Sequence, residues 1–567
     1  MSIFPWLLNK VRSGRLILFF LVSVALYALL RFFESQITHF IIPFFPVEVD
    51  KSFGFYRDFV RLCSDEWLWL TFYFSLAWFL FVYVPLHRFI DGIEKQLFQR
   101  SRLYVGLIFG LWFMISLITS FHTLQEFPNS ADEYVYLFQA ETMSEGKLWQ
   151  TPHPLFDFFH INHIAQKEGL RVGRFPPGWP LVLSAAFILK IPPAIINPIL
   201  GLLSLILFYF FTKRIYNKMV AIWSLVSVAL SAYFIFNSAS FFSHTSCLLF
   251  AVGFVYGIYE YERKNLFIHA LMAGVFLGMV VISRYYTAAI IFLPVGLYLL
   301  NRYKVKCIPA LFWIGLGCLP FLIFLYWYNF KITGNGFLPV TMWINNQESL
   351  GFVQGHSVMK AFEHIVRRFF MFLYWCSPTL VILYFIFLLQ KIKDKSDRLV
   401  HAEDYIFLLL IVGYFFYHHI GGNQYGPRFF LEGLPFLTVF VVRKIFQTRH
   451  KWTLSLFTAG LIYGIVKIPF IANREHRIIT ERVDMYRQAQ EQKIENAVIL
   501  IGSSTGLIRP MQQPELARNS MDYKTDLIYA WYIEDRNQEL MDYYPNRSFY
   551  KYVRDPDSVE GKFIKLK

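Results

Sequence analysis

The chain has few charged residues and few cysteines for its length. Charged side chains make up 16% of its 567 residues, whereas soluble domains carry about 25%. The five cysteines are scattered and form neither a metal-binding pattern nor a disulfide framework. The apolar runs are continuous, so the alternation that a transmembrane β-barrel needs is missing. These shortages exclude an ordinary soluble domain, a disulfide-stapled domain and a barrel.

Apolar and aromatic side chains are abundant instead. The sequence is 56% hydrophobic and 20% aromatic, with a mean hydropathy of +0.41. Apolar runs long enough to cross a bilayer recur between Leu16 and Phe470. The pattern predicts an all-α polytopic membrane protein with about 13 transmembrane helices. The first run, Leu16 to Phe33, is too long for a signal peptide and has no small-residue cleavage site, so we expect it to be the first span.

The net charge of +15 comes mostly from short loops between the apolar runs. Basic loops favour the cytoplasmic side, so this charge indicates membrane orientation and not nucleic-acid binding. Lys10, Arg12 and Arg15 precede the first run, and residues 87–102 form a second basic loop. The next run, Leu103 to Phe121, is therefore expected to cross outward. The stretch Pro177 to Lys190 is short, and we expect it to be an interfacial or re-entrant helix.

Two adjacent acids, Asp132 and Glu133, open a polar stretch on the predicted outer face. Ionisable groups beside lipid are costly and are by default functional candidates. A lone carboxylate facing a cleft acts as a general base towards a hydroxyl, although it does not supply a two-carboxylate hydrolase mechanism. The alternative is structural: acids complement a helix N-terminus, and Ser130 or Asp132 would cap it.

Histidines follow the acid pair. Asp157, His160 and His163 are spaced by three residues, which brings them to one face of a helix. Zinc binding is therefore conceivable, but no His-Glu-x-x-His pattern is present and aromatic residues crowd the segment. Polar packing at the interface is the favoured interpretation, and no metal is assigned.

Three arginines, Arg174, Arg284 and Arg428, fall on the predicted outer side, against the positive-inside trend. The planar guanidinium matches the oxygens of a phosphate group. We therefore expect these arginines to bind the phosphate of a lipid in the outer leaflet.

The polar stretch carries the motif Asp132-Glu133-x-x-Tyr136-x-x-Gln139-Ala140-x-x-Met143-x-x-Gly146-x-Leu148-Trp149. This motif resembles the first outer loop of GT-C membrane glycosyltransferases, in particular the group of protein O-mannosyltransferases and lipid A aminoarabinose transferases. Three further segments are similar to that family: Arg174-Phe-Pro-Pro-Gly-Trp-Pro-Leu, Tyr425-Gly-Pro-Arg428-Phe-Phe-Leu-Glu432 and Tyr544-Pro-Asn-Arg547-Ser-Phe-Tyr550.

This resemblance implies a GT-C-like bundle and an inverting transfer of a sugar from a polyprenyl-phosphate donor to a hydroxyl, or to an amino or phosphate group, of an acceptor on the outer face of the membrane. Asp132 would be the catalytic base with Glu133 beside it, and the three arginines would bind the donor phosphate. The residues expected to contact substrate are Tyr136, His153, His244 and Tyr425. The acceptor would be a glycan, a lipid or a protein, and no cofactor is expected, with a divalent metal left open. The expected location is the bacterial inner membrane, with the site on its periplasmic face.

Three regions are expected along the chain. Residues 1–102 would add two helices before the core, residues 103–470 would form the catalytic core with its first outer loop at 122–178, and residues 471–567 would form a small α/β domain. Strands are predicted at 498–501, 527–532 and 549–553, after a linker helix at 474–492. A flippase for lipid-linked sugars is the main rival; it would need polar groups near mid-bilayer and internal repeats. A glycan ligase is the rival among enzymes.

Overall fold

The computed structural model describes residues 3–41, 49–344, 350–353, 355–393, 401–419, 421, 424–502, 514–554 and 560–567. The chain forms two compact units. The first unit comprises Met1–Phe109, Phe208–Phe234 and Ser349–Ile468. The second unit comprises Gly110–Leu207, Ile235–Glu348 and Pro469–Lys567.

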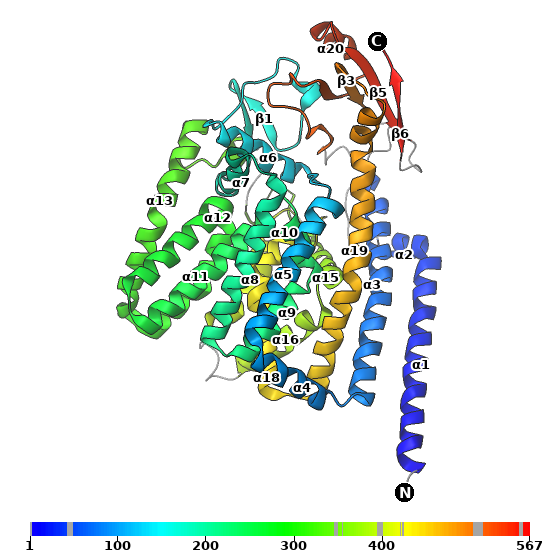
Figure 1. The fold of residues 1–567 in the computed structure, drawn as a ribbon, viewed down its shortest axis with the longest axis vertical. Helices are drawn as coiled ribbons and strands as arrows, with labels where there is room; N and C mark the ends of the chain where they lie inside the picture. Colours follow the sequence, from blue (N-terminus) through cyan, green and yellow to red (C-terminus); the bar gives the residue numbers. More distant parts are fainter. Residues whose placement is uncertain are drawn as a thin grey trace. The chain divides into compact units, whose positions relative to one another are not determined.

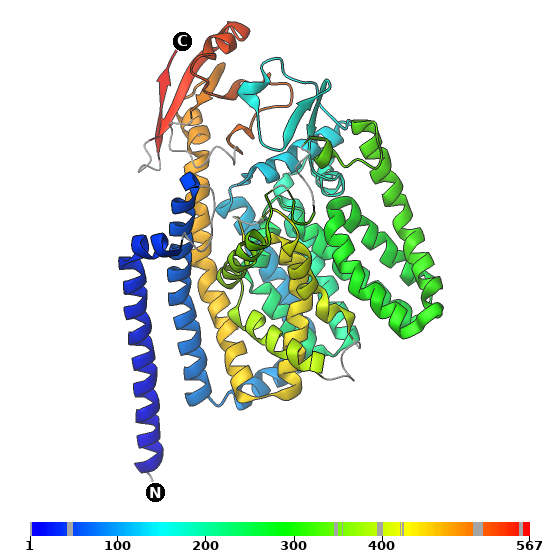
Figure 2. The ribbon, with the colours of Figure 1, turned by 180° about the vertical axis from the view of Figure 1, so that it is seen from behind.

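The first unit is helical in its described residues. Its helices are α1 (Ile3–Phe32), α2 (Glu34–Ile41), α3 (Val49–Tyr83), α4 (Leu86–Gln99), α9 (Lys218–Ala229), α15 (Val358–Trp375), α16 (Pro378–Lys393), α17 (Ile406–Phe415) and α18 (Leu434–Thr448). Short 3₁₀ turns, η6 (Ala402–Tyr405) and η7 (Arg428–Gly433), flank α17. The helices α15 to α18 are seen best from behind (Figure 2).

The second unit joins helices to two small sheets. Its helices are α6 (Ala131–Ser144), α7 (Gly178–Leu189), α11 (His244–Lys264), α12 (Phe267–Tyr303), α13 (Ile308–Thr333), α14 (Val340–Ile344) and α20 (Asn537–Tyr543). A hairpin of β1 (Ile164–Lys167) and β2 (Leu170–Gly173) follows the turn η3 (Phe156–Phe159). The helices α5 (Ser101–Ile118), α8 (Ile196–Ile215), α10 (Ala232–Ala239) and α19 (Lys451–Glu491) each contribute residues to both units.

The chain is an integral membrane protein. Among the described residues, five helical stretches are long and apolar enough to cross a bilayer, or up to seven if two sharply bent helix pairs count as one span each. One of the five, Phe267–Thr333, contains both α12 and α13. The predicted number of about 13 is not confirmed. The 12 residues of α7 rise only about 18 Å, which is less than a hydrocarbon core of about 30 Å, so the expectation of a short helix after the Pro-Pro-Gly sequence is confirmed.

A buried ion pair fixes α3 in the first unit. Glu66 Oε2 lies 3.1 Å from Lys467 Nζ, and the same ammonium donates to Tyr463 Oη at 2.6 Å. Tyr73 Oη lies 2.7 Å from Thr379 Oγ1 on α16. An uncompensated charge among apolar helices would be expensive, so each partner of the pair needs the other. This pairing ties α3 to α19 across 401 residues of sequence.

The C-terminal part of the second unit is a mixed four-stranded sheet. Its strands, in the order β4-β3-β5-β6, are β4 (Leu527–Trp531), β3 (Ala497–Ile501), β5 (Ser548–Arg554) and β6 (Gly561–Lys565). β3 pairs in parallel with β4 and β5, and β6 is antiparallel to β5. Every side chain of β3 is buried, as its unbroken apolar sequence predicts for a central strand. The three predicted strands and the helical linker, which is the end of α19, are confirmed.

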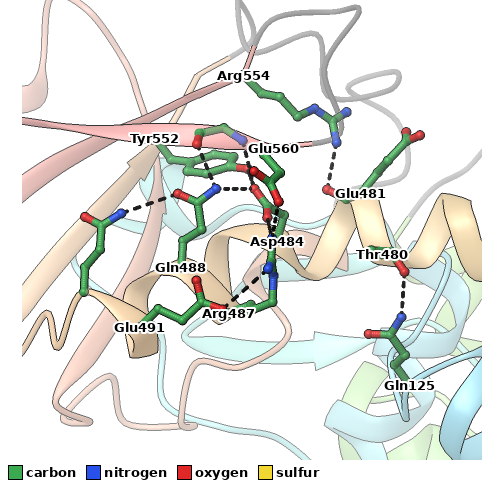
Figure 3. Close-up of polar contacts among 12 residues, drawn as sticks. Gln125, Thr480, Glu481, Asp484, Arg487, Gln488, Glu491, Tyr552, Arg554 and Glu560 are labelled. Carbon is green, nitrogen blue, oxygen red and sulfur yellow. Dashed lines mark hydrogen bonds and ion pairs between the residues drawn. The ribbon is translucent and has the colours of Figure 1, made fainter.

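The sheet is attached to the segment between α6 and α7 and to α19 within the second unit (Figure 1). Phe158 and Phe159 of η3 join the apolar core of the sheet. At the end of α19, the carboxylate of Asp484 accepts hydrogen bonds from Tyr552 Oη at 2.6 Å and from the Gly561 amide at 2.9 Å (Figure 3). Arg554 donates to the Glu481 carbonyl at 2.7 Å. One buried acid thus joins the helix to β5 and β6.

Candidate active site

The acid pair lies at the start of α6. Ser130 is the N-cap of this helix, with φ −151° and ψ 161°, and its hydroxyl accepts a hydrogen bond from the Glu133 amide at 3.3 Å. The Glu133 carboxylate in turn accepts from the Asn129 amide at 2.9 Å. This is a variant of the capping box that Ser-x-x-Glu encodes. The structural alternative, a helix start capped by Ser130 or Asp132, is therefore correct for this segment, and Ser130 is the cap.

Glu133 also connects α6 to a distant loop. It is only 1% exposed, and its Oε1 accepts from the Phe241 amide at 3.0 Å. The same loop, residues 240–243, is held by Trp179 Nε1, which donates to the Phe241 carbonyl at 2.7 Å, and by Asn197 Nδ2, which donates to the carbonyls of residues 240 and 242. The structure therefore gives the Glu133 carboxylate several bonds that organise the protein backbone.

Asp132 has different surroundings. Its carboxylate is 29% exposed, and Oδ1 lies 3.3 Å from His163 Nε2. On the other side of the imidazole, Arg174 Nη1 lies 2.7 Å from His163 Nδ1. His163 therefore bridges the predicted base and one of the predicted phosphate ligands. We call these three side chains the Asp132–His163–Arg174 chain.

The bonding pattern fixes the tautomer of His163. Arginine only donates hydrogen bonds, so Nδ1 must accept and carries no proton. The ring is then neutral, and its one N–H is Nε2–H, directed at Asp132. His163 also has φ +72°, a left-handed conformation that costs energy in a residue with a Cβ and is found preferentially at functional sites.

Tyr136 and Arg284 meet over the same loop. Tyr136 Oη lies 3.2 Å from Ser243 Oγ, and Arg284 Nη1 lies 3.5 Å from that oxygen. The Tyr136 ring stacks on Phe175 with a centroid distance of 4.5 Å. His244, which begins α11, is buried directly beside Ser243. Six of the predicted residues thus gather around the start of α6: Asp132, Glu133, Tyr136, Arg174, Arg284 and His244.

A break in α12 sets the place of Arg284. Its φ of −153° and ψ of 74° interrupt the helix. The start of α7 approaches this break closely, because a Cβ on Gly178 would lie 2.4 Å from Ser283 Oγ and 2.8 Å from the carbonyl carbon of Ile282. Glycine is therefore required at the end of the Arg-Phe-Pro-Pro-Gly sequence for this contact between two helices.

A cavity of about 380 Å³ begins at Arg174 and runs along α13 and α14. Its lining is mostly apolar and aromatic; the residues beyond Arg174 include Phe175, Pro176, Leu322, Leu325, Tyr326 and Val340. Leu322 and Tyr326 are 45% and 44% exposed, so the cavity opens at the lateral surface of the helices. A cation in the lining of a mostly apolar cavity matches an amphiphile with an anionic head.

Two predicted residues, Arg428 and Tyr425, belong to the first unit. Arg428 begins η7 and is buried, and Tyr425 is fully buried with its ring edge against Trp375. Between them, Gly426 has φ +90°, and a Cβ there would press on the Tyr233 ring at 2.9 Å. Tyr233 Oη donates to the Pro427 carbonyl at 2.6 Å. The Tyr-Gly-Pro-Arg sequence thus makes a tightly packed turn.

His153 lies elsewhere in the second unit. Its Nδ1 accepts from the Leu155 amide at 3.0 Å, so Nε2 carries the proton and lies 3.2 Å from Tyr544 Oη. The ring packs against Phe159 and Tyr523. Burial, together with the positive charge of Arg171, lowers the pKa of His153 to about 4. Both ring nitrogens of His153 are engaged with the protein in the aromatic core beside the sheet.

The histidine segment does not form one helix with Asp157, His160 and His163 on a common face; of the three, Asp157 alone lies in the short 3₁₀ turn η3. Asp157 Oδ2 lies 2.5 Å from Arg536 Nη1, and the His160 carbonyl accepts from Trp531 Nε1. Across the described ranges of the chain, His, Cys, Asp and Glu form no group of three or more that is arranged to hold a metal. His163 is the member of this segment that reaches the site. The sequence placed it in the right loop, but no pattern linked it to Asp132 and Arg174.

No protein-family model matches the chain, and no curated protein matches it in sequence. Among solved structures, ArnT from Cupriavidus metallidurans bound to undecaprenyl phosphate has a TM-score of 0.51 at 9% identity, over 79% of this chain and 93% of ArnT. The chain has the GT-C fold. The predicted fold class is therefore confirmed, while the roles of individual side chains in this GT-C fold stay predictions.

Two further structures score lower. ArnT of the same organism in the apo state has a TM-score of 0.49 at 11% identity, over 81% of this chain and 90% of that one. The oligosaccharyltransferase AglB from Archaeoglobus fulgidus, in complex with an inhibitory peptide and a dolichol-phosphate, has a TM-score of 0.42 at 9% identity, over 80% of this chain and 70% of that one. With scores below 0.5, these two similarities support no further conclusion.

Proposed function

We propose that the protein is an inverting glycosyltransferase that moves a sugar from a polyprenyl-phosphate donor to an acceptor hydroxyl on the outer face of a bacterial inner membrane. The observation that carries the proposal is the Asp132–His163–Arg174 chain, whose Arg174 lines a mostly apolar cavity. It brings a carboxylate, a neutral imidazole and a guanidinium together where an amphiphile fits. The undecaprenyl phosphate bound to ArnT, which shares the fold, is a ligand of this chemical kind.

In this mechanism the acceptor oxygen attacks the anomeric carbon as the bond from that carbon to the phosphate oxygen breaks. Asp132 takes the acceptor proton, and general-base assistance of this kind is worth about 10²–10⁴-fold in rate. The lipid phosphate leaves as an anion and needs no strong general acid. Arg174, assisted by Arg284, would hold its charge in a preorganised site, and Arg428 stays a predicted phosphate ligand.

The different burial of the two acids indicates different roles for them. Asp132 is partly exposed and faces His163, whereas the Glu133 carboxylate accepts backbone hydrogen bonds from residues 129 and 241. We therefore assign the proton transfer to Asp132 and the positioning of α6 to Glu133. Tyr136 contacts Ser243, which directly precedes the buried His244, and we propose that both residues contact the sugar or the acceptor. No cofactor is proposed, and a divalent metal is left to experiment.

The test is transfer of a radiolabelled sugar from synthetic polyprenyl-phosphate donors to envelope lipids, glycans and proteins in reconstituted vesicles. Asp132→Asn keeps the side-chain shape but removes the base, and we expect at least a 100-fold loss of turnover with normal thermal stability. Asp157→Asn is the matched control, since it changes an acid of the same loop that pairs with Arg536, and it should remain active. Full activity of Asp132→Asn would refute the assignment. Movement of the intact lipid-linked sugar without transfer would favour a flippase.

A further inference from the structure

A second groove, unrelated to the outer loop, lies in the first unit. It has a volume of about 600 Å³ and is lined by residues of α1, α3 and the beginning of α19. These three helices run side by side (Figures 1 and 2). We name it the N-terminal groove and define it by Arg15 and Phe19 of α1, Ala77, Trp78 and Phe81 of α3, and Trp452 of α19.

The groove has a small floor and aromatic walls. Ala77 and Ser455 are 5% and 1% exposed and lie at its base. Trp78 and Trp452 are 42% and 41% exposed, as side chains that border an unfilled space would be. A floor of small residues between aromatic walls leaves room for a hydrocarbon chain, and tryptophan is favoured at the level of lipid head groups.

Two basic side chains, one that lines the groove and one beside a lining ring, select the head group. Arg15 is exposed and lines the groove just before the apolar stretch of α1, and Lys451 Nζ lies 5.4 Å from the centroid of the Phe81 ring. No Asp or Glu is among the described residues that line the groove. The nearby Arg449 is already engaged by Asp91 and Glu94 of α4. Because these two basic side chains have no acid beside them among the described residues that line the groove, they favour an anionic head group.

The predicted orientation supplies the source of that anion. Basic residues before the first span and between α18 and α19 indicate the cytoplasmic side, where anionic phospholipids concentrate and each nearby basic residue contributes about 1 kcal/mol to their attraction. We propose that the N-terminal groove binds one anionic phospholipid of the inner leaflet, with its phosphate at Arg15 and Lys451 and an acyl chain between Trp78 and Trp452. The lipid would complete the packing of α1 against α3.

The test is native mass spectrometry of the purified full-length protein, offered phosphatidylglycerol, phosphatidylethanolamine or soluble glycerol 3-phosphate. We expect the wild type to retain one phosphatidylglycerol, to retain phosphatidylethanolamine more weakly, and to bind glycerol 3-phosphate negligibly. Arg15→Gln should weaken phosphatidylglycerol binding about fivefold, the ratio that one basic contact gives. Ala77→Phe fills the floor and should abolish retention of both phospholipids. Arg31→Gln is the matched control, because Arg31 lies at the opposite end of α1 beside Glu34, and it should bind like the wild type.

The proposal fails if Arg15→Gln retains phosphatidylglycerol as the wild type does, or if both phospholipids bind equally. It also fails if glycerol 3-phosphate binds as well as the lipid, because the acyl chain would then contribute nothing. Displacement of phosphatidylglycerol by undecaprenyl phosphate from the wild type, lost in Arg15→Gln, would assign the groove to the carrier lipid and overturn the proposal. Since Arg15 is exposed, the folding of its variant is not at risk, and a melting curve checks the folding of Ala77→Phe.

Discussion

His163 has two bonds that can be removed one at a time. Its Nε2–H is directed at Asp132 Oδ1 over 3.3 Å, and its Nδ1 accepts from Arg174 over 2.7 Å. Glutamine carries an amide N–H at the distance of Nε2 from the backbone and can keep the first bond. Asparagine carries its oxygen at the distance of Nδ1, can keep the second bond, and tolerates the left-handed φ of +72°.

The two variants should therefore fail in different ways. A hydrogen bond to a charged group contributes about 1.5–3 kcal/mol, and the exposure of both side chains (29%) puts the bond to Asp132 at the lower end. His163→Asn should then lower kcat about tenfold with the KM for the donor nearly unchanged. His163→Gln should keep more of kcat and raise the KM for the donor, because Arg174 loses its fixed position. His163→Ala should show both defects.

Initial rates at varied donor and acceptor concentrations give this separation of kcat from KM. His160→Gln is the control, because the backbone carbonyl of His160, and not its ring, accepts the bond from Trp531. Equal defects in kcat and KM for His163→Asn and His163→Gln, or wild-type kinetics in both, would refute the assigned bridge. Nitrogen NMR of the imidazole gives an independent check, and a proton on Nδ1 would contradict the tautomer.

Two further outcomes are expected. Glu133→Gln should lower the melting temperature and the yield of folded protein, because an NH₂ replaces one of the oxygens that accept from backbone amides; normal stability with complete loss of turnover would instead make Glu133 catalytic. Acid should destabilise the sheet through His153, whose pKa falls from about 6.5 in the unfolded chain to about 4 in the folded one. The unfolded state then binds more protons between these values, so stability present above pH 6.5 is lost as the pH falls to 4, by about 3 kcal/mol in total. Hydrogen exchange of the β3 and β4 amides at pH 7.5 and pH 5 measures this change in stability. His153→Gln should show a smaller change between the two pH values, and a change as large as that of the wild type would contradict the prediction.

Elements that depend on local sequence were predictable. The apolar runs identify the membrane segments because about 20 consecutive apolar residues suffice to cross a bilayer, and Ser130 caps α6 because its partner is three residues away. The strands of the C-terminal sheet follow from short apolar runs between turn residues. The spacing of Asp157, His160 and His163 did not predict their partners, because the three residues do not share one helix and Asp157 pairs with Arg536.

By itself, the sequence determined that this chain enters a membrane and which of its loops are basic. It also determined that a carboxylate pair begins a helix outside the apolar runs. Only the tertiary structure decided which acid of the pair is buried and which one meets His163. It also decided that Glu66 pairs with Lys467 and that α1, α3 and α19 enclose a groove. The physical reason is that hydropathy and capping act between neighbours in the chain, whereas the direction of a side chain depends on partners tens to hundreds of residues away.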